Sequence, residues 1–233
     1  MSAATKTFSR ILASICHRLD KDVPATTRDA ARFAEYVTAA TKLVWEFYPW
    51  PDALALTTES VTTHPTLTGA RYIPKVTNSR TIGTLNGVYS ANPLADPNAR
   101  QLTVTKRADG YYLPAGSSET TVWLDYRPAP PEYTSELHVI ANEYAVGDLA
   151  WDKDNTGHVY KAIDDAPEDT ALTNTDFWVQ VPVLACLAEP IIAGVIGAHN
   201  ASEGNHGTAR VKLEYMLEMI EHEITLLTNQ EAQ

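Results

Sequence analysis

The sequence predicts an α+β protein in which terminal helices form a small helical bundle, with a central antiparallel β region and a small three-stranded β insert. Apolar residues recur with helical period near both ends of the chain. The middle is rich in Thr, Val, Tyr and Ile, with a turn signal every 8–12 residues. We therefore expect a bundle of residues 1–52 with 183–233, a β region of 53–135 and an insert of 136–182.

Size and composition agree with a protein that folds on its own hydrophobic core. The chain has 233 residues, of which 44% are hydrophobic. That length buries enough apolar surface to make a disulfide or a structural metal unnecessary for folding.

Two helices are predicted before residue 52. Residues 6–20 collect apolar side chains on one face, and Asp22-Val23-Pro24 ends that helix. The next begins at Thr26-Thr27-Arg28-Asp29, where a hydroxyl N-cap is followed by a carboxylate. Pro49 and Pro51 end it. Its buried stripe comprises Ala30, Phe33, Ala34, Val37, Thr41, Val44, Trp45 and Tyr48.

The β region is divided by turn signals, of which Asn86-Gly87 and Asp109-Gly110 are the strongest for hairpins. Asn78-Ser79, Asp96-Pro97-Asn98 and Ala115-Gly116 are further turn signals. Between them we expect the strands Arg71–Val76, Thr81–Leu85, Gln101–Lys106, Tyr111–Leu113 and Thr121–Tyr126.

The insert follows a stiff connector that contains Pro128, Pro130 and Pro131. Three strands are expected in it, Ala145–Trp151, His158–Ile163 and Phe177–Val181.

The chain ends in two predicted helices. Residues 183–199 are apolar almost all round, but Glu189-Pro190 interrupts them and about 17 residues barely reach membrane-spanning length. We expect a buried helix with a kink at Pro190 and no membrane span. After a loop at 200–207, residues 208–228 form a helix with an acidic face and the apolar stripe Leu213, Met216, Leu217, Ile220, Ile224 and Leu227.

The charge is acidic and unevenly distributed. The net charge is −11, which argues against a protein that coats nucleic acid through its phosphates. Residues 136–182 carry 2 basic and 10 acidic residues, and residues 184–233 carry 2 and 7, so the excess acid lies in the last hundred residues. Cys16 and Cys186 are far apart, which favours two reduced, buried thiols in a cytosolic setting, and no signal peptide is expected.

No catalytic or metal-binding pattern is complete. His222-Glu223 lacks the second histidine of a zinc site, because Leu226 stands there. Asp152 to Gly157 begins like a calcium loop, but Ile163 occupies the position of the required glutamate. The simpler interpretation of Asp152–Gly157 is a hairpin turn. We expect no enzyme, no metal and no cofactor.

The aromatic residues of the insert form a recognisable order. Tyr144, Gly147-Asp148, Gly157, Tyr160 and Trp178 follow one another at the spacing of a small β module. Residues 139–182 thereby resemble the chitin-binding modules of carbohydrate-binding families 5 and 12. The resemblance implies exposed rings that stack on sugars, with Tyr144, Trp151, Tyr160 and Trp178 as candidates. The alternative is that the same aromatics form the core of the insert.

The order of segments carries a second resemblance. Trp45-Glu46-Phe47-Tyr48-Pro49-Trp50-Pro51 ends the second helix, and Val122-Trp123-Leu124-Asp125-Tyr126-Arg127-Pro128 ends the β region. Val181-Pro182-Val183-Leu184 then leads into two helices, the last of them acidic. This layout resembles the head–tail connector proteins (adaptor or head-completion proteins) of tailed bacteriophages.

The resemblance implies a virion structural protein, made in the host cytoplasm and located in the neck of the particle. Its expected partners are further copies of itself in a ring, usually twelvefold, the portal protein, downstream neck or tail proteins, and DNA that passes without specific binding. The alternatives are a carbohydrate-binding module on a helical carrier and another neck or tail-completion protein.

Site candidates follow from this hypothesis. Buried aromatic anchors dominate many interfaces, and small residues permit close helix approach. The interface candidates are Trp50, Trp123, Pro190, Gly194 and Gly197, whereas Trp45 lies on the helix stripe and is expected in the core. Glu214, Glu218 and Glu221 are candidates for lining a channel, because like charge disfavours contact with phosphates.

Overall fold

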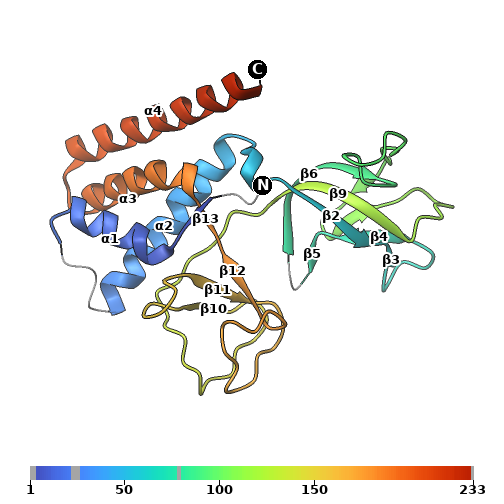
Figure 1. Cartoon of the computed structure of the whole chain (residues 1–233), viewed down its shortest axis with the longest axis horizontal. Helices are drawn as coiled ribbons and strands as arrows, with labels where there is room; N and C mark the ends of the chain where they lie inside the picture. Colours follow the sequence, from blue (N-terminus) through green and yellow to red (C-terminus); the bar gives the residue numbers. More distant parts are fainter. Residues whose placement is uncertain (1–3, 22–26, 78–79, 232–233) are drawn as a thin grey trace. The chain divides into compact units, whose positions relative to one another are not determined.

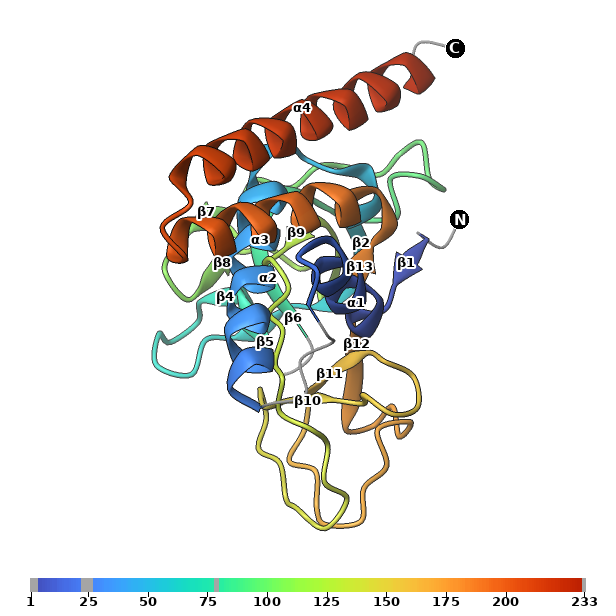
Figure 2. The same ribbon diagram turned by 90° about the vertical axis from the view of Figure 1, so that its left-hand side faces the viewer.

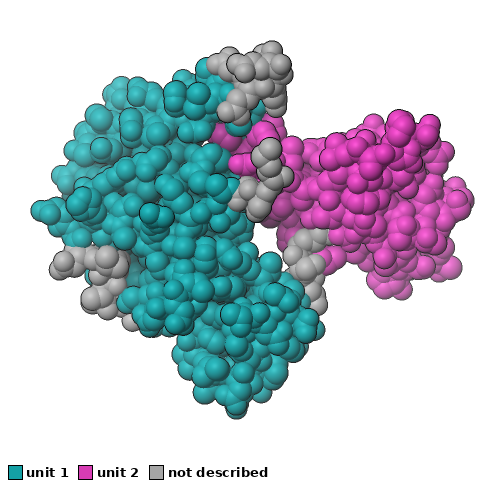
Figure 3. Space-filling model, in the orientation of Figure 1, with its two compact units in different colours: residues 1–48, 130–233 teal, residues 49–129 magenta. Residues whose placement is uncertain are grey.

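The computed structural model describes residues 4–21, 27–77 and 80–231 (Figure 1). It combines helices with antiparallel sheets, which confirms the α+β prediction. The chain forms two compact units, residues 1–48 with 130–233 and residues 49–129 (Figure 3). The sequence-based division set the insert apart from the helices, whereas the structure includes both in the first unit. The predicted breaker at 22–24, the N-cap at Thr26 and the turn at Asn78-Ser79 lie outside the described residues.

Four helices build the core of the first unit: α1 (Phe8–Arg18), α2 (Thr27–Phe47), α3 (Ala188–Ser202) and α4 (His206–Glu231). The predicted packing of terminal helices on one another is confirmed, since α3 contacts α1, α2 and α4. A Cβ atom added to Gly194 would lie 3.2 Å from the Cβ of Ala40 in α2 and 2.8 Å from the Sδ of Met216 in α4. Gly194 therefore lets both neighbours approach α3 closely.

The entry into α3 differs from the prediction. Residues 183–187 form β13 (Val183–Leu184) and the short helix η2 (Ala185–Leu187) before α3 begins. Pro190 is the third residue of α3, where its missing N–H would have had no helical partner. Pro190 therefore lies in the first turn of α3 and not in the helix interior where the prediction placed it as the cause of a kink. The loop to α4 is also shorter than predicted, because α3 continues to Ser202 and α4 starts at His206.

The beginning of the chain pairs with a distant segment. Strand β1 (Thr5–Lys6) runs antiparallel to β13, with Thr5 opposite Leu184 and Lys6 opposite Val183. Thr7 then caps α1, because its hydroxyl accepts a hydrogen bond from the N–H of Arg10 at 3.1 Å.

The insert is the predicted three-stranded antiparallel sheet, in the order β10 (Leu149–Trp151), β11 (Val159–Ala162) and β12 (Trp178–Val181). The predicted turn between β10 and β11 is present. The N–H of Gly157 donates to the carbonyl of Asp152 at 2.7 Å, and the Asp152 carboxylate accepts bonds from Asn155 and Thr156. The small core of the insert comprises Ala150, Ala162, Ala166, Leu172 and Trp178.

Helix α1 holds the insert against the bundle. The indole N–H of Trp151 donates to the Oγ of Ser9 at 3.1 Å, and its ring meets the edge of Phe8 at a centroid distance of 5.4 Å. The N–H of Ser9 donates to the carbonyl of Gly157 at 3.0 Å. In Figure 2 the insert lies below α1, joined to the helices through β12 and β13. The insert is therefore an integral part of the helical unit.

The second unit begins with the short helix η1 (Pro51–Ala53) and contains two four-stranded antiparallel sheets. One has the order β2 (Ala55–Ser60), β9 (Thr121–Pro128), β6 (Arg80–Tyr89) and β5 (Val76–Thr77). The other has the order β3 (Thr62–Thr63), β4 (Arg71–Pro74), β8 (Gly110–Tyr112) and β7 (Thr105–Lys106). Their shared core comprises Ile73, Ile82, Val88, Tyr111, Leu113, Val122, Leu124 and Tyr126.

Only one of the two strong hairpin signals marks a turn. Asp109-Gly110 lies at the turn between β7 and β8, where the N–H of Arg107 donates to the carbonyl of Gly110. Asn86-Gly87 lies inside β6, at a register shift opposite β9. Glycine here accommodates a β-bulge, so the predicted turn is wrong. Strand β2 was not predicted.

Candidate interaction surfaces

The aromatic residues of the insert are buried or half-buried. Trp151 is 4% exposed and Trp178 is 2% exposed, so neither ring face is available to a sugar. The half-buried Tyr144 packs edge-on against Trp178 at 5.0 Å, and its hydroxyl accepts a bond from the N–H of Val139 at 2.8 Å. Tyr160 is half-buried. Tyr144, Tyr160 and Trp178 therefore correspond to the core alternative. Trp151 instead packs against Phe8 of α1.

Four of the five interface candidates are buried within the fold of a single chain. Trp50 is 0% exposed and Pro190 is buried. Gly194 and Gly197 face neighbouring helices, and a Cβ on Gly197 would lie 3.1 Å from the Cγ of Leu213. These residues are engaged in packing within one chain and are not exposed to a second copy. Trp123, in β9, is half-buried opposite Thr58 and Tyr89.

The three channel candidates are exposed on α4. Glu214, Glu218 and Glu221 are separated by four and three residues, which places them on one face of the helix. The Nε–H of Arg210 donates to the Oε1 of Glu214 at 2.8 Å, one turn away.

Exposed apolar residues on α2 and α4 are the surface feature that the sequence did not predict. Leu213 and Leu217, expected in the buried stripe of α4, are 40% and 41% exposed. On α2, Leu43 and Phe47 are 59% and 51% exposed. Their spacing of four residues was a detectable signal, since it puts them together on one face.

A histidine and an aspartate meet in the second unit. The Nε2 of His64 lies 2.8 Å from the Oδ2 of Asp109, and its Nδ1 accepts N–H bonds from Thr66 and Leu67 at 3.1 and 3.0 Å. These bonds assign the proton of the neutral ring to Nε2, which donates to Asp109. The hydroxyl of Tyr112 donates to the same Oδ2 at 2.6 Å.

These bonds shift two pKa values. The hydroxyl of Tyr112, and next the ring of His64, lower the pKa of Asp109. Burial, and then the carboxylate of Asp109, raise the pKa of Tyr112 to about 12. Both ring nitrogens of His64 are already engaged in holding the loop, so the cluster has a structural role.

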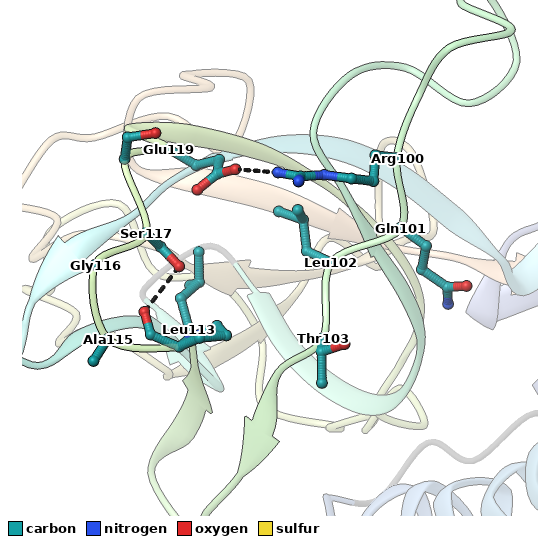
Figure 4. Close-up of a pocket in the computed structure, with 11 residues that line it drawn as sticks. Arg100, Gln101, Leu102, Thr103, Leu113, Ala115, Gly116, Ser117 and Glu119 are labelled. Atoms are coloured by element: carbon teal, nitrogen blue, oxygen red, sulfur yellow. Dashed lines mark hydrogen bonds and ion pairs between the residues drawn. The ribbon is translucent and has the colours of Figure 1, made fainter.

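A pocket of about 510 Å³ lies in the second unit between residues 100–103 and 113–119 (Figure 4). Leu102 and Leu113 contribute apolar surface to it. Its charged groups are paired with each other, since Arg100 bonds to the Oε1 of Glu119 at 2.9 Å. The hydroxyl of Ser117 donates to the carbonyl of Pro114 at 2.8 Å. These contacts leave no activated nucleophile or base pointing into the pocket.

The part of the chain that the structure describes contains neither a cluster of metal-ligating side chains nor a helix that could span a membrane. No three histidine, cysteine, aspartate or glutamate side chains gather there in a metal-binding arrangement. None of the described helices combines the length and apolarity that crossing a membrane requires. Cys16 is a buried free thiol, and Cys186 is half-buried.

Neither the models of known protein families nor the curated proteins contain a match to this chain.

Proposed function

We propose that the protein is a structural component of a tailed-phage virion, an adaptor subunit that joins the portal to the tail as part of a ring. The order of segments, with terminal helices around β structure, supports this proposal. The observation that carries it is the exposure of large apolar side chains on two helices of one unit. Exposed apolar surface of this kind marks sites of protein–protein contact.

The proposed partners follow from that position. Copies of the chain would contact each other in a ring, expected to be twelvefold, with the portal protein on one side and neck or tail proteins on the other. DNA would pass through the ring without specific binding. The net charge of −11 agrees with that, because it disfavours tight contact with phosphates.

The direct test is to locate the chain in assembled particles. Cryo-electron microscopy of the neck should show it beneath the portal, and quantitative mass spectrometry should give about twelve copies for each portal ring. Finding the chain only at the tail tip, or nowhere in the particle, would contradict the adaptor role. A position below a separate adaptor ring would assign it the tail-completion role instead.

Carbohydrate binding is the second candidate function, and its support is the order of aromatics in the insert. It predicts that millimolar chitin oligomers change the fluorescence of Trp151 or Trp178. With both indoles buried and Trp151 bonded to Ser9, we expect unchanged fluorescence. A saturable change would favour the sugar-binding function.

A further inference from the structure

We propose that the pocket of the second unit binds an extended peptide segment of another protein, which adds to the sheet as a strand beside Gln101 and Thr103. The pocket lies between residues 100–103 and 113–119 (Figure 4). The regular spacing of main-chain groups along one of its walls identifies the occupant. The site lies within one unit of a single chain, so it does not depend on the adaptor role.

Residues 101–105 form one extended segment whose two ends pair with different neighbours. The N–H of Leu102 donates to the carbonyl of Val88 in β6 at 2.8 Å. Thr105, in β7, pairs on the opposite side with Tyr112 of β8. Along the segment the side chains are exposed at odd positions and half-buried at even ones, which is the alternation of a β-strand. The main-chain groups of odd-numbered residues therefore face the side of β8.

A proline ends the pairing on that side. Because Thr105 lies opposite Tyr112, a continued ladder would place Thr103 opposite Pro114. Pro114 has no N–H to offer. Its carbonyl instead accepts the N–H of Ser117 at 3.2 Å and the hydroxyl of Ser117 at 2.8 Å. The chain turns away after Pro114, and the pocket lies where the ladder would have continued.

Four main-chain groups along this edge have no hydrogen-bond partner among the residues that the structure describes. They are the N–H and the carbonyl of Gln101 and of Thr103. The bridge between Gln101 and Tyr89 uses the main-chain groups of Arg100 and Leu102 instead. Both Gln101 and Thr103 are exposed and line the pocket.

The spacing of these groups matches an extended chain. At about 3.3 Å per residue, the groups of Gln101 and those of Thr103 are about 6.6 Å apart along the strand. A second strand presents its own N–H and carbonyl groups at the same interval, whereas a helix has already paired its groups internally. Addition of a strand to such an edge is a common mode of peptide recognition.

The opposite wall is held in place within the free chain. The guanidinium of Arg71, in β4, donates to the carbonyl of Ser117 at 2.8 Å and also to the carbonyl of Glu119. Arg100 donates to the Oε1 of Glu119 at 2.9 Å, which links the two walls (Figure 4). A wall that is already ordered reduces the entropy lost on binding. The ion pair can open to admit a chain at little cost, because the side chain of Arg100 is 71% exposed.

The pocket selects a flexible segment over a second folded edge. Gln101 and Thr103 lie between two walls, so the edge of another folded sheet cannot reach them, whereas an extended segment can enter. The volume of about 510 Å³ is in the ordinary range of ligand sites. Leu102 and Leu113 supply its apolar surface. We therefore expect the segment to place a small apolar side chain against these two leucines.

The first test is a selection of random peptides on the full chain, followed by N-methylation of the tightest-binding peptide at one position after another. Each lost N–H that faces the edge should weaken binding about tenfold. Positions between those should tolerate the methyl group, because the N–H groups of a strand point alternately to its two edges. Equal effects at all positions, no effect at any, or a selection without a binding peptide would overturn the proposal.

The second test removes one main-chain donor from the protein. Thr103→Pro deletes the N–H of this edge, whereas Thr103→Ala, the matched control, deletes the side chain and keeps the N–H. Thr103→Pro should weaken binding of the selected peptide about tenfold, and Thr103→Ala should bind as the unaltered chain does. Equal affinities in the two variants would show that the peptide binds elsewhere.

Controls cover misfolding of the proline variant. Leu102 already lies in an extended segment, which is the conformation that a following proline requires. Circular dichroism should therefore be the same for both variants. Hydrogen–deuterium exchange of the unaltered chain needs no substitution, and the N–H groups of Gln101 and Thr103 should exchange more slowly when the peptide is bound. Unchanged exchange at both residues would contradict strand addition.

Two further outcomes concern the partner and the proposed function. If the unaltered chain self-associates in analytical ultracentrifugation, and Thr103→Pro but not Thr103→Ala abolishes this, the occupant is a second copy and not another protein. Peptide binding by a chain that is absent from the virion neck would support the site and contradict the adaptor role. A chain located in the neck that binds no peptide would do the reverse.

Discussion

At the scale of single residues, His64 illustrates how one side chain holds a loop of the second unit. Its Nδ1 accepts bonds from the backbone N–H groups of Thr66 and Leu67, while Nε2–H donates to Asp109. Both ring nitrogens are therefore engaged, and the loop at 64–67 is tied to the hairpin of β7 and β8. Residues 45 positions apart meet here, so no local pattern could predict the cluster.

The phenol of Tyr112 should lose its proton at a higher pH than an ordinary tyrosine does. Burial and the bonded carboxylate of Asp109 raise its pKa to about 12. Asp109→Asn removes the negative charge, so we expect the pKa of Tyr112 to fall toward the ordinary value of about 10. The pKa of Tyr112 can be measured by following the NMR signals of the tyrosine ring carbons as the pH is changed. The variant Tyr112→Phe assigns the signal of Tyr112. The same pKa in both proteins would mean that Asp109 has no part in the shift.

Protonation of His199 should reduce the free energy of unfolding. The buried ring of His199 accepts a bond from the Nζ of Lys21 at 3.0 Å. Burial, and then the charge of Lys21, lower its pKa. The unfolded chain thus binds the proton more readily, and stability is lost as the pH falls below about 6.5.

Urea denaturation at pH 7.5 and 5.5 tests this effect of His199. His199→Gln should show a smaller loss of stability over that range than the unaltered chain. His138 and His158, whose pKa values burial also lowers, remain in both proteins and serve as the common background. Equal losses in the two proteins would assign the pH dependence to other groups.

At the scale of elements, Gly157 determines how the insert meets α1. It lies at φ +71°, and a Cβ there would come within 2.9 Å of the side chain of Ser9. Gly147, in the same insert, has φ +98° with nothing within 4 Å of a Cβ. A substitution at either glycine would strain the backbone, because both have a positive φ. Only a substitution at Gly157 would also crowd a side chain of α1.

Gly157→Ala should therefore destabilise the protein more than Gly147→Ala does. We expect an additional loss of about 1–3 kcal/mol, the usual cost of overpacking. Urea unfolding followed by tryptophan fluorescence measures both variants, because Trp151 lies at the same contact. Equal losses would show that only backbone strain matters and that Ser9 yields without cost.

Helices and strands were predictable where a single sequence pattern was sufficient to identify them. Helical periodicity located α1, α2 and α4, and the strands of the insert followed from short apolar runs between turn residues. The errors came from residues that serve two purposes. Asn86-Gly87 suits a tight turn and equally a β-bulge, and the pairing with β9 selects the bulge. Proline kinks a helix interior but is tolerated in a first turn, so the place of Pro190 depended on where α3 starts.

At the scale of the whole molecule, each of the two units has its own core. Ile73 is fully buried in the second unit, and Ile191 is 1% exposed in α3 of the first. Truncating either to alanine should cost about 2–5 kcal/mol. The loss should stay within the unit that contains the substitution, if the units unfold independently.

Hydrogen–deuterium exchange measures that independence. Ile73→Ala should speed exchange in β4, β6 and β9 but not in α2 and α3, and Ile191→Ala should do the opposite. Faster exchange throughout the chain in both variants would mean that the units unfold as one cooperative body.

Burial decided which candidate residues could act at a surface, and the sequence could not predict burial reliably. Trp50, which lies between two prolines, was a candidate for contact with a partner, yet it is fully buried. Leu213 and Leu217 fit a buried stripe, yet α3 covers only part of α4. The type and spacing of the residues on a helix face can be deduced from the sequence. Which face of the helix is left uncovered depends on contacts with segments far away in the sequence.

The pairing of β1 with β13 has a consequence for synthesis on the ribosome. Thr5 is made long before its partner Leu184, which emerges nearly 180 positions later. Helices α1 and α2 likewise await α3 before their apolar faces are covered. Residues 49–129 are contiguous and can fold meanwhile. We expect the nascent chain to expose α1 and α2 until α3 has been made, and a chaperone would have the greatest effect on yield during that interval.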